Sequence, residues 1–161
     1  MSLLFKLVLA LLALAVIVVI AGLMGNRLPW SEPPGVWQRL LTYITTNVAE
    51  TRLDPVYPEL RERRYTKTMA TVRIATDQAL TELGWEVSKR DEERGQVHAV
   101  ITTALWQFKD DVRIQLRQED SQIAVEVRSA SRVGRGDLGA NTRHILDFYA
   151  ALERALGVTN S

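Results

Sequence analysis

The sequence predicts an α+β protein, with an N-terminal transmembrane helix and then one domain in which two helices pack on a curved, antiparallel sheet of five strands. Three observations predict this class. One long apolar run stands near the N-terminus, two later segments repeat apolar residues at helical spacing, and several segments alternate apolar and polar residues. Short polar turns separate the alternating segments, so their strands must pair antiparallel. The expected order after the anchor is β-α-β-β-β-β-α, with both helices on one sheet face.

The anchor is the apolar segment at residues 3–24. It contains one charge, Lys6, and an unbroken apolar run of 18 residues from Leu7 to Met24. About 20 apolar residues in a helix cross the hydrocarbon core of a bilayer. A cleaved signal peptide is the alternative, but its apolar region usually has about 7–15 residues. The segment also lacks a small-residue cleavage site, and the absence of cysteine excludes a lipoprotein anchor. We therefore expect residues 3–24 to remain in a lipid bilayer.

Residues 26–55 are expected to form a juxtamembrane linker with one short amphipathic helix. Three prolines and two glycines within residues 25–35 exclude a continuation of the first helix. Residues 36–49 then repeat apolar side chains at helical spacing, so this helix would either lie on the headgroups or pack on the domain. The predicted organisation is an anchor at 1–25, this linker at 26–55 and a domain at 56–158. A chain beginning near Val56 is expected to fold by itself.

The first half of the domain is expected to hold a strand, a helix and a hairpin. Residues 60–65 are the first predicted strand. Residues 67–83 place apolar side chains on one helical face, and Gly84 follows as a C-terminal stop. The next two predicted strands, 85–89 and 97–108, flank the polar turn at 91–95.

The second half is expected to hold two more strands and the last helix. The polar residues 109–111 are a predicted turn. Residues 112–117 and 123–130 then alternate apolar and polar side chains, which is the pattern of half-buried strands. Residues 139–156 carry a buried apolar face at helical spacing, and Gly157 closes this helix.

Composition excludes several functional classes. The chain has 20 Lys and Arg against 19 Asp and Glu, a net charge of +1, so it lacks the basic excess of a nucleic-acid-binding protein. The absence of cysteine excludes disulfides, thiol catalysis and Cys-ligated metals. His98 and His144 are the only histidines and stand on different predicted elements, whereas a catalytic zinc usually takes three protein ligands. We therefore expect no metal and no cofactor.

Two groups of residues on the predicted strands and turns have competing interpretations. Trp85, Trp106 and Phe108 either pack in the core or line an apolar groove, and we expect core packing. Asp110 and Asp111 are a potential carboxylate pair, but neighbouring residues in a hairpin turn are usually solvated turn formers, which we expect here.

The stretch 128–144 has the most chemically informative residues. Its Gly134-x-Gly136-x-x-Gly139 matches the dinucleotide-binding fingerprint, but that fold needs a βαβ unit and an acidic residue about 20 positions on, which this sequence does not present. The architectural interpretation is that the glycines allow a sharp strand-to-helix turn while Asp137 caps the helix and Asn141 hydrogen-bonds the loop backbone.

A second interpretation of the same stretch is an anion or partner site built from Arg132, Arg135, Arg143 and the helix N-terminus. A catalytic set of Ser131, Asp137 and His144 is a third, although Ser131 lacks the context of a nucleophile elbow, and we assign no catalytic residue. The candidate residues for contact with a ligand or partner are Arg128, Ser131, Arg132, Arg135, Asp137, Asn141, Arg143 and His144.

The same stretch carries a family resemblance. It reads Arg-Ser-x-Ser-Arg-x-Gly-x-x-Asp-x-Gly-x-Asn-x-Arg from Arg128 to Arg143, with Phe108-x-Asp110-Asp111 and Gly84-Trp85 upstream. This pattern resembles the domain-of-unknown-function family 1499, over about residues 58–156. The resemblance implies a bacterial or plastid setting, often at the envelope, and no established activity. Many members carry a Ser-Pro-Asn-Cys segment ahead of the domain, which this chain lacks.

Three functional hypotheses follow. The first is a non-enzymatic, membrane-tethered envelope domain that binds a partner protein or a small apolar or anionic ligand. The second is a hydrolase-like enzyme that uses the stretch from Ser131 to His144, and the third is a lipid carrier with a groove between the curved sheet and the last helix. We expect a single-pass protein of the bacterial inner membrane, with its domain on the periplasmic side.

Overall fold

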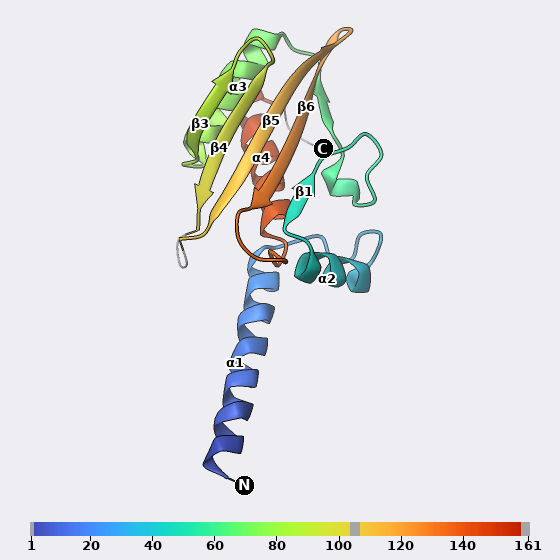
Figure 1. Cartoon of the computed structure of the whole chain (residues 1–161). Coiled ribbons are helices and arrows are strands. Elements are labelled where there is room, and N and C mark those ends of the chain that lie inside the picture. Colours follow the sequence, from blue (N-terminus) through green and yellow to red (C-terminus); the bar gives the residue numbers. More distant parts are fainter. Residues whose placement is uncertain (1, 104–106, 159–161) are drawn as a thin grey trace.

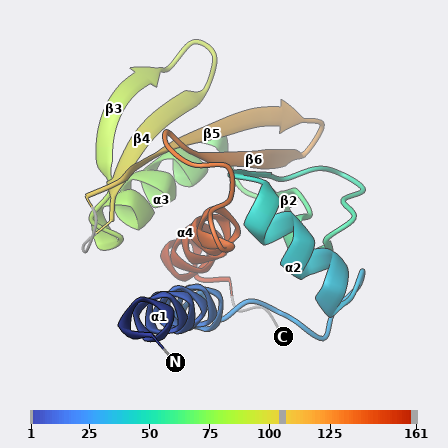
Figure 2. The same ribbon diagram turned by 60° about the horizontal axis from the view of Figure 1, so that its bottom comes forward.

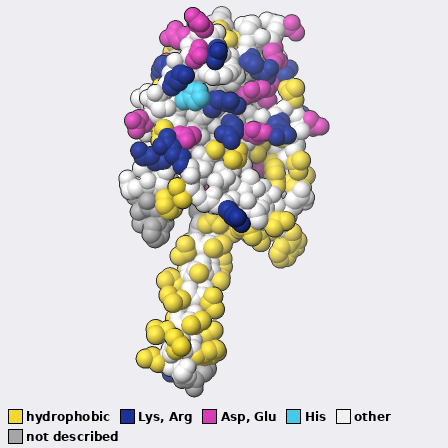
Figure 3. Space-filling model, in the orientation of Figure 1, with side chains coloured by type: hydrophobic (Ala, Val, Ile, Leu, Met, Phe, Trp, Pro, Cys, Tyr) yellow, Lys and Arg dark blue, Asp and Glu magenta, His cyan; other side chains and the backbone are white. Residues whose placement is uncertain are grey.

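The computed structural model describes residues 2–103 and 107–158. It has two parts, a long N-terminal helix and an α+β domain seated at the end of that helix (Figure 1). The long helix is α1, Leu3–Gly25. Within the described residues, this helix is long enough and apolar enough to cross a membrane. Its apolar side chains lie outside the domain (Figure 3), because only Leu23 of α1 is buried.

The domain is built on an antiparallel sheet, which confirms the predicted α+β class. Among the described residues the sheet has six strands in the order β1-β6-β5-β4-β3, with β2 also paired to β6. Each paired register is antiparallel. The strands are β1 at Val48–Glu50, β2 at Arg63–Tyr65, β3 at Glu86–Asp91, β4 at Gln96–Thr102, β5 at Lys109–Glu119 and β6 at Gln122–Ser131.

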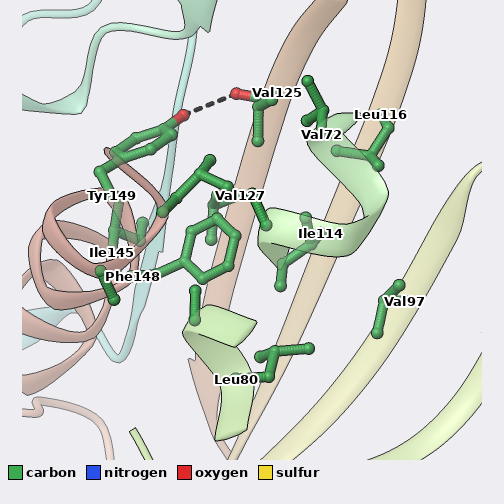
Figure 4. Packing of buried hydrophobic residues seen from close by; sticks show 14 of the residues in the cluster. Val72, Leu80, Val97, Ile114, Leu116, Val125, Val127, Ile145, Phe148 and Tyr149 are labelled. Carbon is green, nitrogen blue, oxygen red and sulfur yellow. Dashed lines mark hydrogen bonds between the residues drawn. The ribbon is translucent and has the colours of Figure 1, made fainter. Parts of the chain in front are cut away.

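Two helices cover one face of this sheet, as predicted. They are α3 at Met69–Glu82 and α4 at Ala140–Leu156, and Figure 2 shows both on the same side of the strands. The side chains between them and the sheet form one buried apolar cluster (Figure 4). Phe148 and Tyr149 are fully buried there, and the Tyr149 hydroxyl donates to the Val125 carbonyl oxygen at 2.6 Å. Between α3, α4 and the sheet, where the lipid-carrier hypothesis places a groove, these described side chains pack against one another.

The segment 26–55, expected as a linker, contributes to the folded domain. It contains α2, Val36–Thr45, whose Arg39 and Tyr43 are buried, and β1, which pairs with the C-terminal half of β6. The sixth strand comes from this segment. A strand of three residues is too short to show the alternation by which the other strands were predicted. A chain beginning at Val56 would lack both elements.

Several element boundaries differ from the prediction. Residues 60–65 do not form one strand, because a short 3₁₀ helix, η1 at Pro58–Leu60, precedes β2. The strand predicted at 97–108 ends at Thr102. Trp106 lies outside the described residues. Phe108 is 50% exposed, so its predicted place in the core is wrong, whereas Trp85 does pack against the core.

The predicted turn at 109–111 is also wrong. Asp110 and Asp111 lie in β5 and pair with Ser131 and Ala130 of β6. Asp110 is 2% exposed rather than solvated, because it stands two residues before Val112 and so faces the core side of the sheet.

Candidate functional site

The connection between β6 and α4, residues 132–139, lies where the domain meets α1, and we call it the motif loop. Leu138 lies so close to Gly22 of α1 that a Cβ atom on this glycine would stand 2.6 Å from Leu138 Cδ1. The Asn26 side chain donates to the Leu138 carbonyl oxygen at 2.9 Å, and the Leu138 amide donates to the Tyr43 carbonyl oxygen at 2.9 Å. The motif loop therefore joins α1 and α2 to the start of α4.

Asp137 caps the N-terminus of α4, as the architectural interpretation predicted. One carboxylate oxygen accepts from the Gly139 amide at 2.8 Å and the other from the Asn141 amide at 2.9 Å. Its negative charge also suits the positive end of the helix dipole. Gly139 is required beside it, because φ is +85° there and a Cβ atom would stand 2.2 Å from Leu28 Cδ1.

Asn141 joins three segments from inside the domain. It is fully buried, and its Oδ1 accepts from the Ser129 hydroxyl at 2.5 Å. Its Nδ2 donates to the Asn47 carbonyl oxygen and to Ser131 Oγ, both at 2.9 Å. Both amide hydrogens and the amide oxygen are thus used. Its buried position agrees with the prediction, and the partners of its side chain come from β6 and from the connection between α2 and β1.

His144 stands beside this network on α4. Its Nδ1 lies 3.3 Å from Ser129 Oγ and 3.7 Å from Asp110 Oδ2, and its ring meets Trp85 edge-on at 6.0 Å between centroids. Burial lowers the pKa of His144, although the carboxylates of Asp110, Asp147 and Asp137 act in the opposite direction. His144 thus favours its neutral form.

These contacts do not have the arrangement of a catalytic triad. A triad histidine uses one ring nitrogen for the serine and the other for the acid. Here the serine and the carboxylate both approach Nδ1, and the serine is Ser129, which is fully buried and donates to Asn141. Ser131 Oγ instead accepts from Asn141.

Ser129, Asp110 and Asn47 are the network residues that the sequence prediction missed. A signal for the first two was present. Ser129 stands two positions after Val127 and Asp110 two before Val112, so each is a polar residue at a position of the core-facing series. No periodicity marks Asn47, which lies between α2 and β1.

The candidate arginines do not converge on one anion. Arg132 binds Asp111 through two hydrogen bonds of 2.9 and 2.7 Å, and this contact holds the pKa of Asp111 below its ordinary value. Arg143 pairs with Asp147 one turn along α4, and Arg128 lies 3.9 Å from Glu50. Arg135 is exposed on the motif loop. Three of the four candidate arginines thus have carboxylate partners.

A cavity is lined in part by Asp137, and we call it the α2–β1 pocket. It has a volume of about 230 Å³ and lies between the end of α2, β1 and the segment 52–60. Tyr43, Ala49 and Tyr57 supply apolar lining, while Asp137 and Thr142 line it from the start of α4. The sequence prediction missed this pocket because its walls come from segments that meet only in the tertiary structure.

The residues of the described ranges form no group of three or more His, Asp or Glu side chains placed to hold a metal ion.

Comparison with known proteins identifies the domain. The model of a family described as a protein of unknown function, DUF1499, matches residues 28–152. The match begins ahead of α2 and so includes the segment that the structure packs onto the domain. No curated protein matches the chain. Because the family model covers most of the sequence, including the motif loop and both halves of the sheet, this chain belongs to the DUF1499 family of proteins of unknown function.

Proposed function

We propose that this protein is a membrane-anchored binding domain whose α2–β1 pocket takes a small, largely apolar ligand with a polar group. The observation that carries the proposal is the position of this pocket, which Asp137 of the motif loop lines directly. Asp137 is part of the sequence pattern by which the family was recognised. The pocket thus connects the most distinctive stretch of the sequence with a concave surface.

The lining indicates the class of ligand. Apolar side chains such as Tyr43 and Val56 would contact an apolar body, and Thr46 and Thr142 would supply hydroxyl groups for a polar end. Pockets for drug-sized ligands usually have about 300–1,000 Å³. At about 230 Å³ this pocket suits a smaller molecule or one part of a larger amphiphile. We favour such a ligand over a protein partner because the surface is concave. We favour it over an anion because Arg52, which lines the pocket, pairs with Glu50, and because Asp54 and Asp137 also line it.

The test uses two neighbouring tryptophan substitutions in the full-length protein. Both Thr45 and Thr46 are exposed, but Thr46 lines the pocket and the adjacent Thr45 does not. Thr46→Trp should fill the pocket, and Thr45→Trp is the matched control. We expect mass spectrometry to find a small molecule that co-purifies with the natural protein and with Thr45→Trp, but is lost from Thr46→Trp. Equal retention by both variants would disprove the pocket as the binding site.

The hydrolase hypothesis remains a testable alternative. It needs a reactive serine, and the geometry disfavours one because Ser129 is buried and Ser131 Oγ accepts a hydrogen bond from Asn141. A covalent serine-directed probe tests it directly. Labelling at Ser131 that is lost in His144→Gln would support the enzyme, and the absence of labelling would support the binding domain.

We further propose that α1 spans the bacterial inner membrane and that the domain faces the periplasm. The apolar length of α1 supports the span. The envelope setting that the family resemblance implies supports the choice of membrane and side. The chain has no cysteine, so a single Ser121→Cys substitution on the exposed β5–β6 turn creates one labelling site. A membrane-impermeant maleimide should label it in intact spheroplasts. Labelling only after lysis would reverse the orientation.

A further inference from the structure

The helix α2 buries its single charged residue and exposes several large apolar side chains. Its inner face carries Arg39 and Tyr43, which are 0% and 3% exposed, and Leu40, which packs beside Tyr43. Its outer face carries Trp37, Leu41 and Ile44, which are 82%, 60% and 44% exposed. Residues 37, 41 and 44 follow the i, i+4, i+7 spacing of one helical stripe. A helix in water would place its charged residue outward and its large apolar residues inward.

The position of α2 relative to α1 indicates what meets this outer face. Figures 1 and 2 show α2 lying crosswise beside the end of α1, at the same end of the domain. Figure 3 shows hydrophobic side chains gathered at this end, while charged side chains are spread over the sheet above it. Leu23, Leu28 and Tyr43 form one buried cluster, so α1 and α2 are packed together and α2 cannot be far from the membrane that α1 would cross.

The motif loop extends the same surface. Gly136 lies against Ile44, because a Cβ atom at this glycine would stand 2.3 Å from the Ile44 carbonyl oxygen. Val133 of this loop is 64% exposed, and Arg135 is exposed beside it. An apolar stripe with a tryptophan and a neighbouring basic residue is the composition that settles at the boundary between headgroups and acyl chains.

We propose that the outer face of α2 rests in the headgroup region of the same bilayer that α1 crosses. The domain is then held against the membrane by two contacts, the span and this helix, rather than hanging from a flexible tether. The inference rests on α1 as a span but does not depend on a ligand in the α2–β1 pocket.

Depth measurement by spin labelling tests this proposal in the full-length protein. The chain has no cysteine, so single variants Leu14→Cys, Leu41→Cys and Ser121→Cys each carry one nitroxide. The protein is reconstituted in vesicles of phosphatidylcholine and phosphatidylglycerol, and the collision rates with oxygen and with a water-soluble nickel complex are compared. Leu14 reports on the span, Leu41 on the outer face of α2, and Ser121 on the exposed β5–β6 turn.

We expect collisions with oxygen to dominate at position 14 and collisions with the nickel complex to dominate at position 121. At position 41 we expect an intermediate ratio of the two collision rates. Equal ratios at positions 41 and 121 would overturn the docking of α2, while a water-like ratio at 14 would overturn the span itself. Dipolar broadening between labels at position 41, with protection from both reagents, would show that a second copy covers the face and would also overturn the proposal. Trp37→Ser should raise access of the nickel complex at position 41 several-fold, whereas Gln38→Ser on the flank of the helix should not.

Discussion

Arg39 of α2 and Glu59 of η1 form a buried ion pair that fastens the segment after the anchor to the domain. The Arg39 side chain is fully buried and that of Glu59 is 10% exposed. The guanidinium also donates to the Glu32 and Pro33 carbonyl oxygens at 3.1 and 2.6 Å and to the Tyr43 hydroxyl at 3.1 Å. The Tyr57 ring lies 5.1 Å from its central carbon. One side chain thus organises the chain between α1 and η1.

Breaking this pair from one side should destabilise the protein strongly. Arg39→Met leaves the Glu59 carboxylate buried without a cation, and removing one partner of a buried pair costs about 3–5 kcal/mol. The measurement is the free energy of unfolding in urea, in detergent. The double variant Arg39→Met/Glu59→Leu removes both charges and should recover part of the loss. A cost below about 1 kcal/mol for the single variant would show that the pair is solvated.

Asn141→Ala should destabilise the domain by removing hydrogen bonds from its partners. The Ser131 hydroxyl loses its contact with Asn141, whereas the Asn47 carbonyl oxygen keeps the Ser131 amide as a donor and Ser129 Oγ keeps its contact with His144 Nδ1. Each hydrogen bond lost in this way costs about 0.5–1.5 kcal/mol. Asn141→Asp is the control for the donors, because it keeps the shape but cannot donate to Ser131 and Asn47. The melting temperatures of both variants should lie well below that of the natural protein. An unchanged melting temperature for Asn141→Asp would contradict the assigned network.

Asp137→Ala should lower stability through the loss of a helix cap. A cap of this kind contributes about 0.5–2 kcal/mol. Arg135→Ala and Arg143→Ala should change the melting temperature little, because exposed or half-exposed charges contribute about 0–1 kcal/mol. If Asp137→Ala melts normally but loses function in a deletion-complementation assay, the carboxylate has a chemical role in the pocket and the capping explanation is insufficient.

The folded protein should lose stability as the pH falls through the ordinary pKa of histidine. Burial lowers the pKa of His144 in the folded state, so the unfolded chain takes up this proton first, at a pH of about 6.5. The free energy of unfolding is therefore higher above that pH and decreases below it. Melting temperatures at pH 7.5 and pH 5.5 check this. His144→Gln should show a smaller difference between the two, and an equal difference would assign the pH dependence to other groups.

The span should resist alkaline extraction. Leu3–Gly25 is apolar throughout except for Lys6, and water cannot satisfy its backbone outside a helix in lipid. The full-length chain should stay in the membrane pellet after a carbonate wash, with an N-terminus at Met1 or Ser2. Recovery of a mature chain that begins after Met24 would identify α1 as a signal sequence.

Local residue patterns were sufficient to predict the class of fold and the place of the motif. The long apolar run predicted α1, and period-two and helical patterns predicted β3, β4, β5, β6, α3 and α4, because local alternation directly reflects which face of an element is buried. The types of residue at Asp137, Gly139 and Asn141 also predicted a capped turn, since each type has a specific conformational or hydrogen-bonding use at a helix start.

The contacts of the motif loop depend on long-range packing and could not be predicted from local patterns. Ser129, Asp110 and Asn47 are far apart in sequence and meet around Asn141 and His144 because the start of β5, the end of β6 and the start of α4 lie side by side. The α2–β1 pocket and the Arg39–Glu59 pair likewise join segments that carry no local pattern in common. The energy of a buried charge or amide in such contacts is set by the groups that pair with it. Periodic patterns in the sequence do not indicate which residues those groups belong to.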